Sequence, residues 1–303
     1  MLTPRHKKRY FGFGEYSPIE HLAKIAALSR FSWQEVHFAM FTACFDAAGS
    51  EHDQRFFVVA GFISTADEWI KFDKAWKDRL AQDGLSYFHA VDFAASREEF
   101  KHGWKENEPR RRKLTEDLIE IIRLRAFRFF GNVVEVKTLQ KHLPAEKLKE
   151  YHLNAYALCA MTCVKDVLAW CKQERSPQFE RIRFVFEDGD LGRGNLIRRF
   201  KDDLEMTPNF EVKRDTETKY GKRFAFVPLQ ASDFLAYELF QGSKNMSDRK
   251  HQPRWPLQEF LSMPGYPNII EADNLERLDL NHRVAKETMD RFRKVYNNAD
   301  KIG

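Results

Sequence analysis

The chain has 303 residues, of which 43% are apolar, 31% charged and 14% aromatic. This composition excludes a disordered, a fibrous and a membrane-spanning protein, because it can supply an apolar core but holds no apolar run near the roughly 20 residues that cross a bilayer. The 50 Lys and Arg residues exceed the 45 Asp and Glu residues by 5, which permits a nucleic-acid partner without requiring one.

The first 35 residues mix turn-forming glycines with a short helical pattern, and we expect them to form an arm outside the core. The basic run at residues 5–9 is not followed by an apolar segment, so no export signal is predicted. The four cysteines are too few for a disulfide scaffold in a chain of this length. We therefore expect a cytoplasmic protein with reduced thiols.

Two strands are predicted after the arm. Residues 37–46 are rich in aromatic and small apolar side chains and end at a turn-forming Ala-Ala-Gly-Ser sequence, and residues 55–63 (RFFVVAGFI) have the same character. The spacer between the two is short and polar, which favours a hairpin of antiparallel neighbours.

The rest of the chain alternates between helical and extended patterns. Each helix is predicted from apolar residues at helical spacing, and each strand is predicted from a run of apolar residues. Helices are expected over about 69–80, 109–122, 145–172, 196–204 and 228–240 and near 280–295, strands over 127–136, 182–186, 210–214 and 224–227, and an extended or mixed stretch over 87–93.

This order of strands first, then alternating helices and strands, predicts an α/β protein with a mixed sheet of five or more strands flanked by helices. We divide it into an arm (1–35), a core (36–242) with a helical insertion around 65–125, and a C-terminal loop and helix (243–303) packed on the core.

Carboxylates stand at three places where the neighbouring residues are apolar. Asp46 ends the first strand, Glu187, Asp188 and Asp190 follow a later strand, and Asp233 lies inside an apolar helix. Buried carboxylates are costly unless they are paired or bound to a cation. If these elements converge, Mg²⁺ or Mn²⁺ between the acids would relieve their repulsion, and a metal pair about 4 Å apart is the usual apparatus for phosphodiester hydrolysis.

The simpler interpretation is that each acid after a strand is a turn residue, and Asp188 precedes a glycine in a common turn dipeptide. Continuing the strand alternation would place Asp188 and Asp190 on one side and Glu187 on the other, although a turn would break that phase. On the helix, we favour Asp233 over Glu238, because the two point in different directions.

Two other chemistries deserve comparison. His152, Cys159 and Cys163 share a helical stripe, but ligands confined to one helix rarely enclose zinc, and we expect core packing instead. Paired acids also serve glycosidases, and only the acids themselves bear on the choice between sugar and phosphate.

Four short motifs carry a family resemblance. They are Asp46 and Gly49 with the following FVVAGFI strand, FHAVDF with His89 and Asp92, FVFEDGD, and LQASDFLAYE. In this order they resemble the motifs of a microbial family called domain of unknown function 3800, which is itself similar to the ribonuclease H-like superfamily. The resemblance covers residues 37–240.

The resemblance implies a ribonuclease H-like fold, which places carboxylates on the first strand, a later parallel strand and a final helix. It implies metal-ligand and catalytic roles for Asp46, Asp188 and Asp233, with His89 and Asp92 as auxiliary site residues. His89 would assist proton transfer or position phosphate, whereas a histidine beside aromatic residues is more often structural.

The chain departs from the family at its first motif, where Asp46-Ala47-Ala48-Gly49 replaces Asp-Glu-Ser-Gly. We predict a metal-dependent phosphodiesterase that acts on RNA or DNA by two-metal-ion hydrolysis. The alternative is a nucleic-acid-binding or protein-interaction module that keeps the fold without catalysis, and a homo-oligomer stays open. Basic residues near the acidic turn would hold a phosphate backbone. They include Arg198, Arg199, Lys201, Lys213, Arg214, Lys219, Lys222 and Arg223, and a further run covers residues 110–113.

Overall fold

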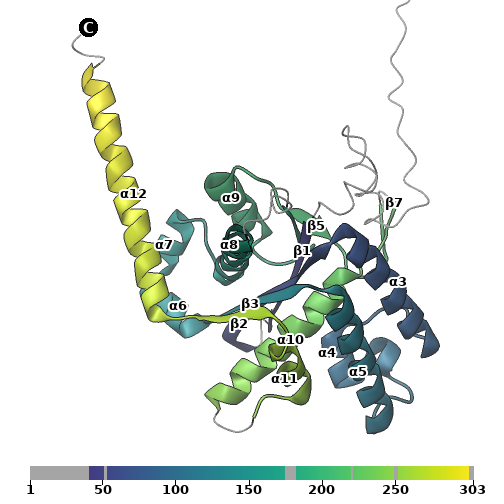
Figure 1. Ribbon diagram of the computed structural model, residues 1–303. Helices are drawn as coiled ribbons and strands as arrows, with labels where there is room; N and C mark the ends of the chain where they lie inside the picture. The colour runs from purple at the N-terminus through teal and green to yellow at the C-terminus, as the bar shows by residue number, and fades with distance from the viewer. Residues whose placement is uncertain (1–40, 51–52, 175–181, 220, 249–251, 300–303) are drawn as a thin grey trace, which may run out of the picture.

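The computed structural model describes residues 41–50, 53–174, 182–219, 221–248 and 252–299, so the predicted arm at 1–35 lies outside the described residues. The described chain is an α/β protein built on a six-stranded mixed sheet with helices on both faces, which confirms the predicted class (Figure 1). The strands of this sheet are β1 (Phe41–Ser50), β2 (Asp53–Thr65), β3 (Arg128–Glu135), β4 (Ile182–Glu187), β5 (Asn209–Glu211) and β8 (Gly265–Ile270).

The strand order is β5-β4-β1-β2-β3-β8. β1, β2 and β3 form an antiparallel meander, and the β1–β2 hairpin is the one that the sequence predicts. β4 lies parallel to β1, and β5 lies parallel to β4, so the carboxyl ends of these three strands meet at one edge of the sheet. Glu187 at the end of β4 is thereby brought near Asp46. Asp46 does not end its strand as the sequence predicts: it lies within β1, one residue past the last residue that pairs with β4.

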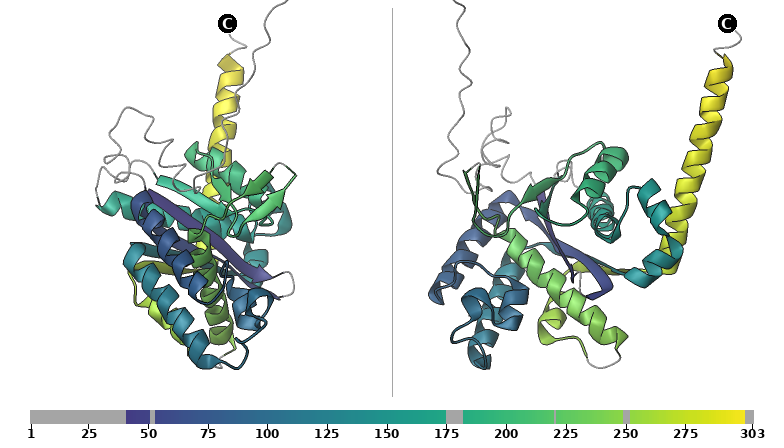
Figure 2. Two further views of the ribbon diagram at one scale, coloured as in Figure 1. Left: turned by 90° about the vertical axis from the view of Figure 1, so that its right-hand side faces the viewer. Right: turned by 180° about the vertical axis from the view of Figure 1, so that it is seen from behind.

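Helices cover both faces because both sets of alternating side chains are apolar. Val58 and Val59 of β2 illustrate this, since they belong to separate clusters of buried residues on opposite faces. One face is covered by α3 (Ala66–Gln82), α4 (Ala90–Ala95), α5 (Glu108–Arg125), α10 (Pro228–Ser247) and α11 (Trp255–Leu261). The other is covered by α6 (Val136–His142), α7 (Ala145–Glu150), α8 (Ala155–Glu174) and α9 (Arg193–Leu204) (Figure 2).

The helix predicted over 145–172 is divided into α7 and α8. The Asn154 side chain accepts a hydrogen bond from the backbone N–H of Ala157 at 2.8 Å, so it caps a new helix that begins at Ala155. The preceding His152 has a φ of +52°, which a continuous helix does not allow.

The segment before α10 also differs from the prediction. Residues 224–227 lead into α10 without forming a strand, and a separate hairpin precedes them, made of β6 (Thr216–Thr218) and β7 (Gly221–Arg223). The aromatic and apolar residues Phe226 and Val227 are buried against α10's side of the sheet, which explains their strand-like composition.

The C-terminal segment contributes more than a loop and a helix. β8 pairs with β3 at the edge of the sheet, where a strand can contain Pro267. A short helix, η1 (Glu98–Phe100), lies within the helical insertion, and the long α12 (Ala272–Ala299) packs on α6 at its start and then extends away from the other elements (Figure 1). Among the described residues, no helix combines the length and apolar character needed to cross a bilayer.

Candidate functional site

Asp46 lies on β1 on the face that α10 covers. Its neighbours Phe45 and Ala47 pack on the opposite face, as alternation along a strand requires. The Asp46 side chain is 0% exposed, and Oδ1 accepts a hydrogen bond from the Ala47 backbone N–H at 2.7 Å. A buried carboxylate needs a cationic partner, and Oδ2 lies 3.0 Å from the ammonium of Lys213.

Glu187, and not Asp188, joins Asp46. Glu187 is the last residue of β4, and Oε2 lies 2.9 Å from the Lys213 ammonium. Asp188 instead pairs with the guanidinium groups of Arg193 and Arg223. The structure therefore places the predicted ligand Asp188 outside the group of acids around Lys213.

Asp233 reaches the same ammonium from α10. Oδ1 lies 3.0 Å from Nζ of Lys213, and Oδ2 accepts a hydrogen bond from the Ala90 backbone N–H at 2.6 Å. The carboxyl is buried, as Asp46 is. Glu238 lies elsewhere on α10, where its nearest ion-pair partner is Arg254 at 3.5 Å.

We call Asp46, Glu187, Asp233 and Lys213 the carboxylate–lysine cluster. Three elements supply its acids, and Lys213 stands two residues after β5. The Lys213 side chain is only 15% exposed, and its ammonium donates to all three carboxylates at 2.9–3.0 Å. The ammonium therefore occupies the point on which the acids converge.

The position of Lys213 is fixed through Gln230 of α10. Nε2 of Gln230 donates to the backbone carbonyl of Lys213 at 2.7 Å. Oε1 of Gln230 accepts from Nε1 of Trp76 and from the Phe88 backbone N–H, both at 2.8 Å. This buried amide links α3, the segment before α4 and the loop that carries the lysine.

The cluster is unbalanced in charge. Three carboxylates and one ammonium leave a formal charge of −2 if all four groups are ionised. Burial raises the pKa of Asp46 well above its ordinary value; Lys213 lowers it, and the charges of Glu187 and Asp233 raise it further. Burial alone would lower the pKa of Lys213, but attraction by the three acids outweighs it and holds that pKa well above the ordinary value.

His89 stands beside the cluster, and Asp92 orients it. Nδ1 of His89 lies 2.7 Å from Oδ2 of Asp92, and Nε2 lies 3.5 Å from Oδ1 of Asp233. The imidazole is 28% exposed, so solvent reaches it. When Nδ1 donates to Asp92, the neutral ring presents Nε2 toward the cluster as a proton acceptor.

Asp190 is a further acid close to Asp46. Burial raises the pKa of Asp190 to about 7, and the charge of Asp46 adds to the rise. Its Oδ2 atom is buried and has no hydrogen-bond partner among the described residues. Four of the five predicted ligands therefore lie in this region, and Asp188 faces the basic residues beside it.

The predicted basic run at residues 110–113 is largely engaged within the molecule. Arg110 pairs with Asp83 at 2.9 Å, and Arg111 donates to the Phe93 backbone carbonyl at 2.8 Å. Nearer the cluster, Arg214 lies over the ring of Tyr87 at 5.6 Å. An exposed guanidinium above an aromatic ring two residues before His89 is suited to contact an anionic ligand.

Cys159 and Cys163 of α8 are core residues, as the sequence predicts. Their thiols contact backbone carbonyls of β2. In the part of the chain that the structure describes, no three His, Cys, Asp or Glu side chains are spaced to hold a metal ion directly. The three acids of the carboxylate–lysine cluster are spaced around the ammonium of Lys213.

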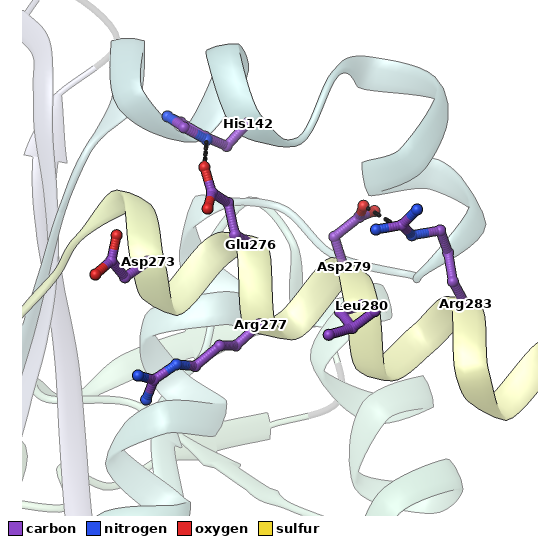
Figure 3. A pocket seen from close by; sticks show the side chains of 7 residues that line it. All are labelled: His142, Asp273, Glu276, Arg277, Asp279, Leu280 and Arg283. Atoms are coloured by element: carbon purple, nitrogen blue, oxygen red, sulfur yellow. Dashed lines mark ion pairs between the residues drawn. The ribbon is translucent and has the colours of Figure 1, made fainter.

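A surface pocket lies apart from the cluster, where α12 begins. Its lining contains two ion pairs, between His142 and Glu276 at 3.2 Å and between Arg283 and Asp279 at 3.3 Å (Figure 3). It includes none of the predicted site residues. The lining residues are His142, Asp273, Glu276, Arg277, Asp279, Leu280 and Arg283.

Comparisons with known protein families, with curated proteins and with solved structures find no match to this chain. The sequence places Lys213 among the basic residues that would hold a phosphate backbone, whereas the structure places its ammonium among the carboxylates. Sequence reasoning missed this pairing, because a lysine in a polar stretch carries no signal that distinguishes a buried partner of acids from a surface residue.

Proposed function

We propose that the protein is a metal-dependent phosphodiesterase of ribonuclease H-like fold that cleaves nucleic acid by two-metal-ion hydrolysis. The observation that carries the proposal is the convergence of Asp46, Glu187 and Asp233 on one cationic point. These acids stand on the first strand, on a strand parallel to it and on a later helix, which is the distribution that the family resemblance implies. Glu187 takes the place that the sequence assigns to Asp188.

The carboxylate oxygens of the cluster are the type of donor that a hard divalent cation binds. Mg²⁺ and Mn²⁺ prefer carboxylate oxygens, and all three acids already surround a positive charge. Mg²⁺ needs oxygens at about 2.1 Å, closer than the ammonium holds them. The fit therefore requires the acids to close in after the ammonium leaves.

When bound, divalent ions of this class activate a water and stabilise the oxygens of the phosphate. Asp46, Glu187 and Asp233 would hold them. His89, kept in place by Asp92, accepts or returns a proton at Nε2 on the exposed side of the cluster. Arg214 and Tyr87 flank this side and would contact the phosphate backbone and a base of a single strand.

The test is Mn²⁺-dependent cleavage of RNA, DNA and hybrid substrates by Asp46→Asn, Glu187→Gln and Asp233→Asn proteins. We expect each to lose at least about 100-fold in rate, because each removes a charged oxygen donor from the cluster. Asp188→Asn is the matched control, since its side chain pairs with arginines outside the cluster, and it should stay within about threefold of wild type. Equal activity of the Asp46 and Asp188 variants would reject the proposed site.

A second candidate is the non-catalytic nucleic-acid-binding or protein-interaction module. Ala47 and Ala48 favour it, and so does the ammonium that already neutralises part of the acidic charge. Thermal unfolding separates the two: the enzyme should be stabilised by millimolar Mn²⁺, and Asp46→Asn should remove that stabilisation. A melting temperature that ignores Mn²⁺ favours the module, for which binding of nucleic acid should weaken steeply with salt.

The proposal places the enzyme in the cytosol. Cys44, Cys159, Cys163 and Cys171 are free and buried, which suits a reducing compartment.

A further inference from the structure

We propose that Lys213 is the resident cation of the cluster and that a divalent metal ion must displace its ammonium in order to bind. This inference rests on the proposed function. It gives Lys213 a role in metal binding that differs from the role of the acids as ligands.

The ammonium of Lys213 occupies the space that a metal ion would need. Nζ of Lys213 lies 3.0, 2.9 and 3.0 Å from oxygens of Asp46, Glu187 and Asp233, so the ammonium fills the space that these oxygens enclose. A metal ion bound to the same oxygens would stand within about 3 Å of the nitrogen. Two positive charges at that distance repel strongly, so one excludes the other.

The Lys213 side chain can leave the cluster without a change in the backbone. The lysine backbone is held by Gln230, whose Nε2 donates to the carbonyl at 2.7 Å. The four-carbon side chain has rotatable bonds throughout, so its ammonium can leave while the backbone stays in place. The acids come from two strands and a buried helix, and Asp233 is additionally held by the Ala90 N–H at 2.6 Å. The lysine side chain therefore has more rotatable bonds than any of the three acids.

The three acids need a compensating positive charge at all times. Removing the ammonium without replacing it would leave three carboxylates in a mostly buried site, which is strongly unfavourable. A divalent ion supplies more positive charge than the lysine does. Exchange of one cation for the other keeps the acids compensated in both states.

Isothermal titration of the full chain with MnCl₂ tests the inference. Lys213→Met removes the competing charge, and we expect it to bind Mn²⁺ at least about tenfold more tightly than wild type, since the binding-competent state no longer requires displacement. Lys222→Met is the matched control: it also deletes one lysine charge, but Lys222 pairs with Asp215 at 2.8 Å outside the cluster. Its affinity should stay within about twofold of wild type.

A second measurement uses the wild type alone and so does not depend on the folding of a variant. Acylation of amines by an N-hydroxysuccinimide ester, followed by peptide mass spectrometry, reports which lysines are accessible. Lys213 should be protected without metal and become reactive when Mn²⁺ is added, whereas Lys222 should react equally in both conditions.

The outcomes separate the inference from the proposed function. If wild type binds Mn²⁺ and Lys213→Met binds it no more tightly, or if Lys213 stays protected in the Mn²⁺ complex, the displacement is wrong while the enzyme proposal stands. If neither protein binds Mn²⁺, both are wrong.

Discussion

At the scale of single residues, the molecule contains two kinds of buried acid. Asp46 and Asp233 have hydrogen-bond donors or a cation at both carboxyl oxygens. Glu238 on α10 is only 2% exposed, yet Oε2 has no hydrogen-bond partner among the described residues, and Oε1 lies 3.5 Å from Arg254. The first kind belongs to the carboxylate–lysine cluster. The second kind lowers the stability of the fold when its carboxyl is ionised.

The Glu238 carboxyl predicts a pH effect on stability. Burial raises its pKa to about 7 in the folded chain, and Arg254 opposes only part of that rise. The Glu238 carboxyl ionises near pH 4.5 in the unfolded chain and near pH 7 in the folded chain. The free energy of unfolding therefore falls as pH rises from 4.5 to 7, and this loss of stability is complete above pH 7. Glu238→Gln should therefore stabilise the protein at pH 8 by about 3 kcal/mol and have little effect at pH 4.

Urea unfolding at the two pH values measures this difference. Glu116→Gln is the control, because Glu116 is exposed and pairs with Arg112 on the same helix. An effect of Glu238→Gln that is the same at pH 4 and pH 8 would mean that its ionisation does not oppose folding.

At the scale of elements, α12 is joined to the rest of the molecule near its first turns. Asp279 accepts hydrogen bonds from the Tyr151 hydroxyl at 2.7 Å and from Lys147 at 2.8 Å, and His282 stacks on the Tyr151 ring at 4.1 Å between centroids. A single carboxylate thus connects α12 to α7 and to the residue that follows it.

The hydrogen bonds from Lys147 and Tyr151 lower the pKa of Asp279 below its ordinary value. The ionised Asp279 carboxylate therefore stabilises the packing of α12 at pH values above the ordinary pKa of an aspartate. This stabilisation is lost as pH falls through the lowered pKa of Asp279 in the folded chain. We expect amide exchange in residues 272–284 to accelerate in Asp279→Asn at pH 7, with exchange in β1 and β2 unchanged. Equal exchange in the two proteins would show that other contacts hold α12 in place.

At the scale of the whole molecule, the hairpin of β1 and β2 is the centre on which both helical layers pack. Gly61 of β2 faces the β1 backbone so closely that an added Cβ would lie 1.7 Å from the carbonyl oxygen of Cys44. The approach of these strands is therefore possible only with glycine. It also sets the position of Asp46, which follows Cys44 by two residues on the same strand.

Gly61→Ala should lower the free energy of unfolding by at least about 3 kcal/mol or prevent soluble expression, because the strands must separate and both cores loosen. Gly194→Ala is the control: nothing lies within 4 Å of its added Cβ, and alanine in helix α9 should be neutral or stabilising by up to about 1 kcal/mol. Urea unfolding of both variants measures the contrast. A stable Gly61→Ala protein would contradict the packing of this hairpin.

Much of the fold could be predicted from local sequence patterns. Alternating and continuous apolar runs predicted the hairpin of β1 and β2, the strands β3 and β4 and most of the helices, because burial of one face or two leaves a period in the sequence. β8 escaped prediction because an edge strand is short, exposed and able to contain proline. The break between α7 and α8 was missed because Asn154 acts through a cap that apolar spacing does not reveal.

By itself, the sequence determined the α/β class, the hairpin and the presence of acids within or directly after apolar elements, since all of these follow from side-chain periodicity along a strand or helix. Only the tertiary structure decided that Glu187 joins Asp46 and that Asp188 turns to arginines, because this depends on which face of the sheet α10 covers. It also decided that Lys213, distant in sequence from Asp46, stands among the acids. Contacts between remote segments are set by packing in three dimensions and leave no periodic trace in the chain.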